Sequence, residues 1–111
     1  MSIIAKNGNT GNVKWAFLNA SGAGDTELVA AVTGTAIRVV ALHLVSTAAN
    51  TVKFRSNTTD KTAGKPLAAN GGLVLPLNEH GWFETAAGEK LNFNQSAATA
   101  AGVSVAYVEV R

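Results

Sequence analysis

The side chains with the greatest capacity for acid–base or metal chemistry in this sequence are its two histidines, His43 and His80. His80 directly follows Glu79 in "LNEHGW", but adjacent residues of an extended chain point in opposite directions and do not form a dyad. No Gly-x-Ser-x-Gly sequence supplies a nucleophile for His80 to activate. We therefore predict no catalytic residue, and we expect Glu79 and His80 to form a turn between a strand ending at Leu77 and one beginning at Trp82.

Metal binding is also disfavoured by the positions of these histidines. A zinc site needs three or four converging ligands, and neither a His-x-His nor a His-x-x-x-His spacing occurs. Cysteine is absent, which excludes thiolate ligands and disulfides alike. His43 lies within an apolar run, where a neutral, hydrogen-bonded histidine of a core or an interface is more usual than a ligand. We expect neither a metal nor a cofactor.

Three glycine-rich stretches, "NGNTG", "SGAGD" and "ANGGL", raise the possibility of phosphate binding. None has the Gly-x-Gly-x-x-Gly or Gly-x-x-x-x-Gly-Lys-Ser/Thr spacing that dinucleotide or P-loop sites require, so we interpret them as turns. Asn70-Gly71 is the residue pair typical of tight hairpin turns. The nine Lys and Arg residues are scattered and the net charge is +2, which is a poor footprint for nucleic acid.

The aromatic residues offer a second kind of binding chemistry. Trp82 and Phe83 lie on opposite faces of their predicted strand, so one of them can fill a core while the other faces outward. A stacking platform normally gathers several aromatic rings on one face, and the chain has only two Trp, one Tyr and four Phe residues. Core and interface packing is therefore favoured. A carbohydrate-binding module with Trp82 or Trp15 as its stacking residue stays an alternative, followed by an enzyme that uses His80.

The strongest structural signal is "TAIRVVALHLVST", residues 35–47, which is rich in β-branched and aliphatic residues. A regular strand here places Ile37, Val39, Ala41, His43 and Val45 on one face, and Arg38, Val40, Leu42 and Leu44 on the other. Both faces are mostly apolar. We therefore expect a central strand whose second face is covered by another sheet, a loop or a neighbouring subunit.

The remaining chain reads as short strands separated by turns. "NTVKFRS" alternates apolar and polar residues, residues 57–66 form an exposed loop, and four further runs follow: "GLVLPL", "GWFETAA", "EKLNFNQS" and "GVSVAYVEV". Earlier in the chain, "NVKWAFLN" and "TELVAAVT" are interpreted as strands, although a helix is an alternative for the second. This pattern predicts an all-β, single-domain antiparallel β-sandwich of jelly-roll type.

The ends and the composition complete the outline. We predict an N-terminal arm over residues 1–12 and a β-sandwich domain over residues 13–111. No apolar stretch is long enough for a membrane helix or a signal peptide, so we expect neither a membrane partner nor export through a leader. Only 14% of residues are charged, against roughly 25% in ordinary soluble domains. This low charge suggests that other subunits cover part of the surface.

The segments "AANTVKFRS", "PLAANGG", "VLP", "GWFET" and "GEKLNFN", with the closing "AYVEV", resemble a recurrent type of small structural protein of tailed bacteriophages. The resemblance covers roughly residues 36–110, and its motifs are structural rather than catalytic. It implies a virion role, most plausibly a head decoration (cement) protein that binds the outside of the capsid, often as a homotrimer. The first 35 residues match no part of this pattern.

The resemblance also implies partners and a location. We expect the major capsid protein and further copies of this chain as partners, with no nucleic acid, membrane or small-molecule substrate. The protein would be assembled in the host cytoplasm and reside on the capsid surface of the virion. The candidate capsid contacts are Ile3, Ile4 and Lys6, because the two apolar isoleucine side chains on an exposed arm would be buried favourably against a partner. The alternative within the virion is a tail, neck or head-fibre component.

Overall fold

Every secondary-structure element of the described chain is a β-strand. The computed structural model describes residues 2–4 and 10–111. The strands are β1 (Ser2–Ile4), β2 (Thr10–Asn12), β3 (Lys14–Ala20), β4 (Gly24–Val29), β5 (Ala36–Ser46), β6 (Asn50–Ser56), β7 (Thr59–Asp60), β8 (Lys65–Leu67), β9 (Gly72–Leu75), β10 (Phe83–Glu84), β11 (Leu91–Gln95) and β12 (Ala101–Val110). The predicted all-β class is confirmed. Among the described residues there is no helix that could cross a membrane.

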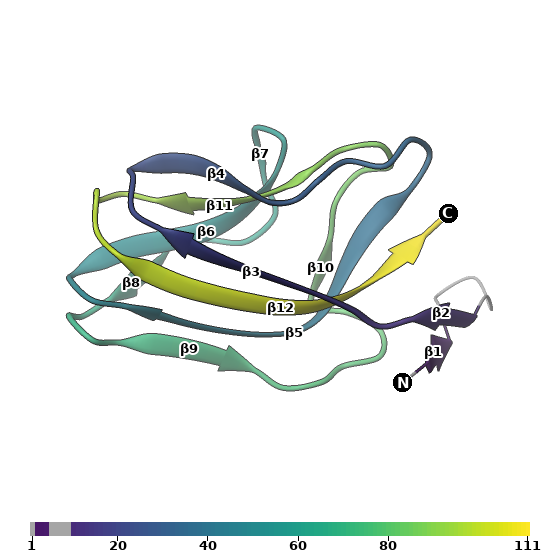
Figure 1. Ribbon diagram of the computed structural model, residues 1–111, viewed down its shortest axis with the longest axis horizontal. Coiled ribbons are helices and arrows are strands. Elements are labelled where there is room, and N and C mark those ends of the chain that lie inside the picture. The colour runs from purple at the N-terminus through teal and green to yellow at the C-terminus, as the bar shows by residue number, and fades with distance from the viewer. Residues whose placement is uncertain (1, 5–9) are drawn as a thin grey trace.

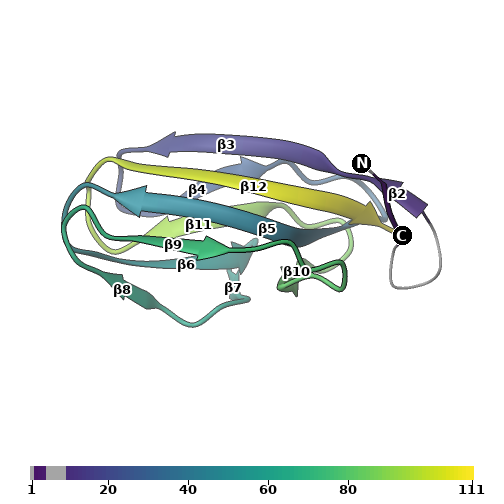
Figure 2. The same cartoon turned by 90° about the horizontal axis from the view of Figure 1, so that it is seen from below.

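Two antiparallel sheets pack face to face, as expected for a β-sandwich (Figure 1). In the first sheet, β3 pairs with β12, β12 with β5, and β5 with both β9 and β10. In the second, β4 pairs with β11, β11 with β6, and β6 with both β7 and β8. Figure 2 shows β3, β12, β5 and β9 side by side, with the second sheet behind them. We call these the β3 sheet and the β4 sheet.

The core lies between the two sheets and is built from the inward residues of each strand. Val103 and Val105 of β12 and Leu91 and Phe93 of β11 are almost completely buried. The ring centroid of Phe54 lies 5.5 Å from that of Phe93 and 5.1 Å from that of Phe83. These contacts join β6, β11 and β10 across the sandwich, because alternate residues of a strand point to one face.

A bulge in β5 changes which of its residues face the core. Ala106 of β12 is opposite Ala41 and Tyr107 is opposite Val39, so Val40 has no residue opposite it. One extra residue reverses the faces of all later side chains. Ile37 and Val39 before the bulge, and Leu42 and Leu44 after it, join the main core. The regular alternation predicted for residues 35–47 is therefore wrong beyond Val39.

Asn70-Gly71 forms a turn, but not the hairpin that the pair predicted. The Gly71 amide donates to the Ala68 carbonyl at 2.8 Å, and Asn70 adopts a left-handed φ of 59°. This turn carries the chain from β8 in the β4 sheet to β9 in the β3 sheet. Likewise, β5 and β6 are consecutive but belong to different sheets. The connections from β8 to β9 and from β5 to β6 therefore join the two sheets and are not hairpins within one sheet.

The N-terminal third is also made of strands. Residues 24–29 form β4, so the strand interpretation of "TELVAAVT" is confirmed for residues 26–29, although the strand ends before residues 30–33, and the helix alternative is wrong. β1 and β2 pair as a separate two-stranded sheet, with Ile3 opposite Gly11 and Ile4 opposite Thr10. The β1–β2 sheet and the C-terminal end of β12 lie at the same end of the sandwich (Figure 1).

Candidate functional site

The sequence-predicted contact residues are placed only in part. Ile3 and Ile4 lie in β1, whose backbone pairs with β2. Lys6 lies outside the described residues. The prediction that these three residues form one contact site is therefore not tested by the structure.

The residues considered for catalysis are spread over the surface. Glu79 and His80 form the predicted turn, in which the Gly81 amide donates to the Asn78 carbonyl at 2.9 Å. The adjoining strands are shorter than expected, since β9 ends at Leu75 and β10 begins at Phe83. His43 is exposed, because the bulge turns it away from the core. In the described part of the chain, no three His, Asp or Glu side chains lie together as metal ligands would.

A cavity of about 360 Å³ lies beside this turn, lined by Arg38, His80, Gly81, Trp82, Phe83 and Glu84. Arg38 is 1% exposed, and its Nε donates to Glu84 Oε1 at 2.8 Å. Its Nη1 and Nη2 atoms have no hydrogen-bond partner among the described residues. Trp82 is fixed at the rim, since its Nε1 donates to the Pro76 carbonyl at 2.7 Å. The hydrogen bond of Trp82 orders the loop, and the Arg38 ion pair engages the Glu84 carboxylate that lines the cavity.

The outer side of the β3 sheet presents a contiguous uncharged surface, which we call the apolar face. Four large side chains stand out from it: Trp15 (72% exposed), Phe17 (76%), Val45 (52%) and Val74 (71%). The strand registers place His43 and four small residues between them, namely Ala41, Gly102, Ser104 and Ala106. None of these residues is Asp, Glu, Lys or Arg. Exposed apolar patches of this kind mark interaction surfaces.

Cross-strand register makes the apolar face continuous across four strands. Phe17 of β3 is opposite Ser104, Ser104 is opposite His43, and His43 is opposite Val74 of β9. In the next row, Trp15 is opposite Ala106, which is opposite Ala41. Residues directly opposite in an antiparallel pair share a face. Aromatic rings on β3 and Val74 on β9 therefore stand on either side of His43 and of small residues on the two central strands.

Between these borders the apolar face is hollowed. A groove of about 180 Å³ is lined by Trp15, Val74 and Leu75 at its sides, with Ala41, Leu42, His43, Ser104 and Ala106 completing the lining. Its dimensions and apolar lining suit one or two aliphatic or aromatic side chains of a partner better than a charged group. Towards the chain termini the same side of the sheet is closed off, where Val13 packs against Val40, Val108 and Val110.

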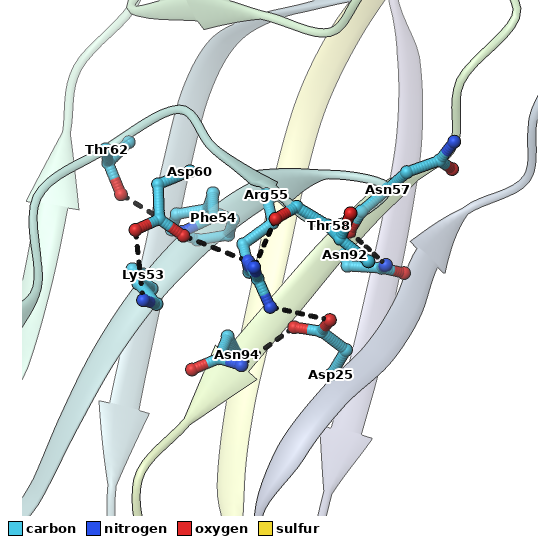
Figure 3. Close-up of polar contacts among 10 residues, drawn as sticks. All are labelled: Asp25, Lys53, Phe54, Arg55, Asn57, Thr58, Asp60, Thr62, Asn92 and Asn94. Carbon is cyan, nitrogen blue, oxygen red and sulfur yellow. Dashed lines mark hydrogen bonds and ion pairs between the residues drawn. The ribbon is translucent and has the colours of Figure 1, made fainter.

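The outer side of the β4 sheet has the opposite character, and we call it the charged face. Arg55 forms ion pairs with Asp25 at 3.0 Å and Asp60 at 2.9 Å, and its Nη2 donates to the Thr58 carbonyl (Figure 3). Lys53 reaches Asp60 at 3.1 Å. Because these charges satisfy one another, the face is suited to remain in water without a partner.

Amide side chains extend this network across the sheet. Asn94 Nδ2 donates to Asp25 Oδ1 at 2.7 Å, and Asn92 Nδ2 donates to the Asn57 carbonyl at 2.9 Å (Figure 3). The network therefore reaches from β4 through β11 and β6 to β7. Asp25 and Asp60 each lie against cations, and no exposed aromatic side chain accompanies them on these strands.

The apolar face was not found by the sequence analysis, although a signal for it exists. Trp15 and Phe17 alternate with Ala16 and Leu18, so β3 is apolar on both of its faces. Sequence reasoning recognised this property only in residues 35–47. Two-sided apolar strands normally have both faces covered, and β3 has only its inner face covered in the described structure.

No protein-family model and no curated protein matches this chain.

Proposed function

We propose that this protein is a non-enzymatic structural component of a tailed-phage virion, which binds the outside of the capsid as a decoration (cement) protein. The observation that carries the proposal is the contrast between the two outer faces of the sandwich. The uncharged apolar face offers buried contact area to a lattice of major capsid protein, while the charged face is internally paired and fits the solvent side. The family resemblance supplies the capsid as the partner.

The topology supports the proposed jelly roll. β3, β12, β5 and β9 form one sheet and β4, β11, β6 and β8 the other, and the chain crosses between the sheets from β3 to β4, β4 to β5 and β5 to β6. It crosses again from β8 to β9, from β10 to β11 and from β11 to β12. Jelly rolls are two-sheet sandwiches of eight strands that occur in viral capsid and lectin domains. A structural role in a virion is compatible with that architecture.

The proposal is tested by adding purified protein to parent-phage capsids that lack it, and measuring the amount bound. Val74→Lys places a charge at the rim of the groove and is expected to weaken binding at least about tenfold, because an unpaired charge must be desolvated in the contact. Glu27→Lys is the matched control: it changes an exposed residue of β4 in the other sheet and should change binding by no more than about twofold.

Two results would overturn the docking proposal. One is unchanged binding by Val74→Lys, and the other is loss of binding by Glu27→Lys alone. The cementing role has its own measurement, the resistance of capsids to heat and low salt with and without the protein. Equal resistance would remove that role even if the protein bound.

Ile3, Ile4 and Lys6 stay our proposed contacts within the arm, in addition to the apolar face. Deletion of residues 2–8 is expected to weaken capsid attachment and to leave the thermal unfolding of the sandwich unchanged, since the main core of the described side chains lies in β3 to β12. Full attachment of the deleted protein would show that the arm takes no part.

A carbohydrate-binding module is the second candidate, because Trp15 and Phe17 are exposed neighbours on one sheet face. Trp82 is less suited, since its indole nitrogen is held by Pro76. A glycan-array signal that Trp15→Ala abolishes would favour this function over the capsid role. Electron microscopy of the parent particle separates the virion alternatives, because a tail, neck or fibre protein occupies a ring or a single position rather than the whole lattice.

A further inference from the structure

β3 is the exposed border of the β3 sheet, and its outer edge has no strand beside it among the described residues. It is seven residues long and, among the described strands, pairs only with β12, in an unbroken register from Lys14 to Ala20. Figures 1 and 2 show it as the outermost strand of its sheet. An edge strand carries a row of unpaired backbone N–H and C=O groups that another strand can complete.

The other edges of the sandwich are protected in ways that β3 is not. β7 and β10 have two residues each, β8 contains Pro66, and β9 is four residues long and followed by Pro76. β4 carries exposed Asp25 and Glu27, and its register with β11 shifts at Leu91. Short length, proline, charge and bulges are the devices that block strand addition. β3 contains none of them except one charge, Lys14, at its first position.

The side chains of β3 make this edge attractive to an apolar partner. Trp15 and Phe17 are the most exposed aromatic residues of the described chain, and both stand on the apolar face directly beside the open edge. Together they leave on the order of 300 Å² of aromatic surface in water. A strand added to β3 would cover part of this surface as well as pairing the backbone.

We propose that a second copy of this chain is that partner, through antiparallel pairing of the two β3 strands about a two-fold axis. A copy centred on Ala16 sets Trp15 opposite Phe17 of the second copy, twice over, which gives two aromatic cross-strand pairs. The single charge of each strand, Lys14, then lies at opposite ends of the contact, so no two like charges are opposed.

This pairing joins two β3 sheets into one and makes the two apolar faces continuous. Because a two-fold contact uses the same surface on both copies, it closes at a dimer. A dimer differs from the trimer that the family resemblance implies. The inference is independent of the proposed function, since it concerns the isolated protein, and its failure is therefore distinguishable from failure to bind capsids.

Sedimentation equilibrium of the purified full chain tests the proposal. The mass is expected to rise from 11.4 kDa towards twice that value as the concentration increases from about 1 to about 200 μM. Phe17→Lys should hold the protein at the monomer mass, because it places a charge beside the edge. Val74→Lys, on the same face but at the opposite border, should leave the dimer intact.

Amide hydrogen exchange distinguishes strand pairing from contact between faces. Amides of β3 should exchange more slowly at the high concentration than at the low one, while amides of β9 should not change. A monomer mass at about 200 μM, a dimer that Phe17→Lys leaves intact, or a dimer without concentration-dependent protection of β3 would each overturn the proposal.

Discussion

At the scale of single residues, the approach of Gly81 to Arg38 is one of the closest that a glycine makes in the described structure. Gly81 has a φ of 86°, and a Cβ atom built there would lie 2.4 Å from Cγ and 2.7 Å from Cδ of Arg38. Arg38 is buried under the loop and held by Glu84, so its stem has little room to move. Glycine is required here both for the backbone conformation and for the close approach.

Gly81→Ala should therefore destabilise the protein by about 2–4 kcal/mol, from the left-handed conformation and the clash together. Urea unfolding followed by tryptophan fluorescence measures the free energy. Gly22→Ala is the control, since a Cβ atom there meets nothing within 4 Å, and its cost should stay within about 0.5 kcal/mol. Equal stabilities of the two variants would contradict this account of Gly81.

At the scale of elements, the β6–β7 hairpin is held by charges on its outer side. Lys53 and Arg55 of β6 both contact Asp60 of β7 (Figure 3). The hydrogen bond from Lys53 lowers the pKa of Asp60 below its ordinary value, against a smaller opposing effect of desolvation, and attraction to both cations adds to the lowering. The contact therefore stabilises the hairpin above the unfolded-state pKa of Asp60, and this stabilisation is lost as pH falls through the folded-state pKa.

Lys53→Gln should raise the pKa of Asp60, because it removes the hydrogen-bonding cation. A carboxyl-detected NMR titration of Asp60 gives the midpoint directly. Lys61→Gln, a change in the exposed residue next to Asp60, should shift the midpoint less. If both substitutions moved it equally, general charge rather than the Lys53 contact would set the pKa.

At the scale of the whole molecule, the sandwich places its phenylalanines in two very different environments. Phe93 is 0% exposed and packs against Phe54, whereas Phe17 is 76% exposed on the apolar face. The first stabilises the fold by joining the sheets. The second contributes little to folding and is available for binding, which is the division expected if the apolar face serves partners.

Phe93→Ala should cost about 3–5 kcal/mol, since it leaves a cavity between the sheets. Phe17→Ala should change the stability of the monomer by no more than about 0.5 kcal/mol. Thermal and urea unfolding of both variants at low protein concentration, where any dimer dissociates, provide the comparison. A large loss of stability in Phe17→Ala would show that the apolar face belongs to the fold itself.

The sequence by itself determined most of the strand content, although the short strands β7 and β8 formed where residues 57–66 had been predicted as a loop. Periodicity and turn residues predicted the runs that became β3, β5, β6, β9, β11 and β12, and the turn at Glu79 and His80. These features are local, because alternation and turn chemistry depend on residues close together in the chain. It also excluded thiolate sites through the absence of cysteine.

Only the tertiary structure decided which faces are covered. The unpaired Val40 reverses the later part of β5 and exposes His43 and Val45, and no sequence pattern marks that position. Similarly, the open edge of β3 and the position of Trp15 beside it depend on strand order, which long-range pairing sets. A strand that is apolar on both faces is expected to have both faces buried. The pattern does not show whether the second face is buried by this chain or by a partner, because burial depends on how the whole molecule packs.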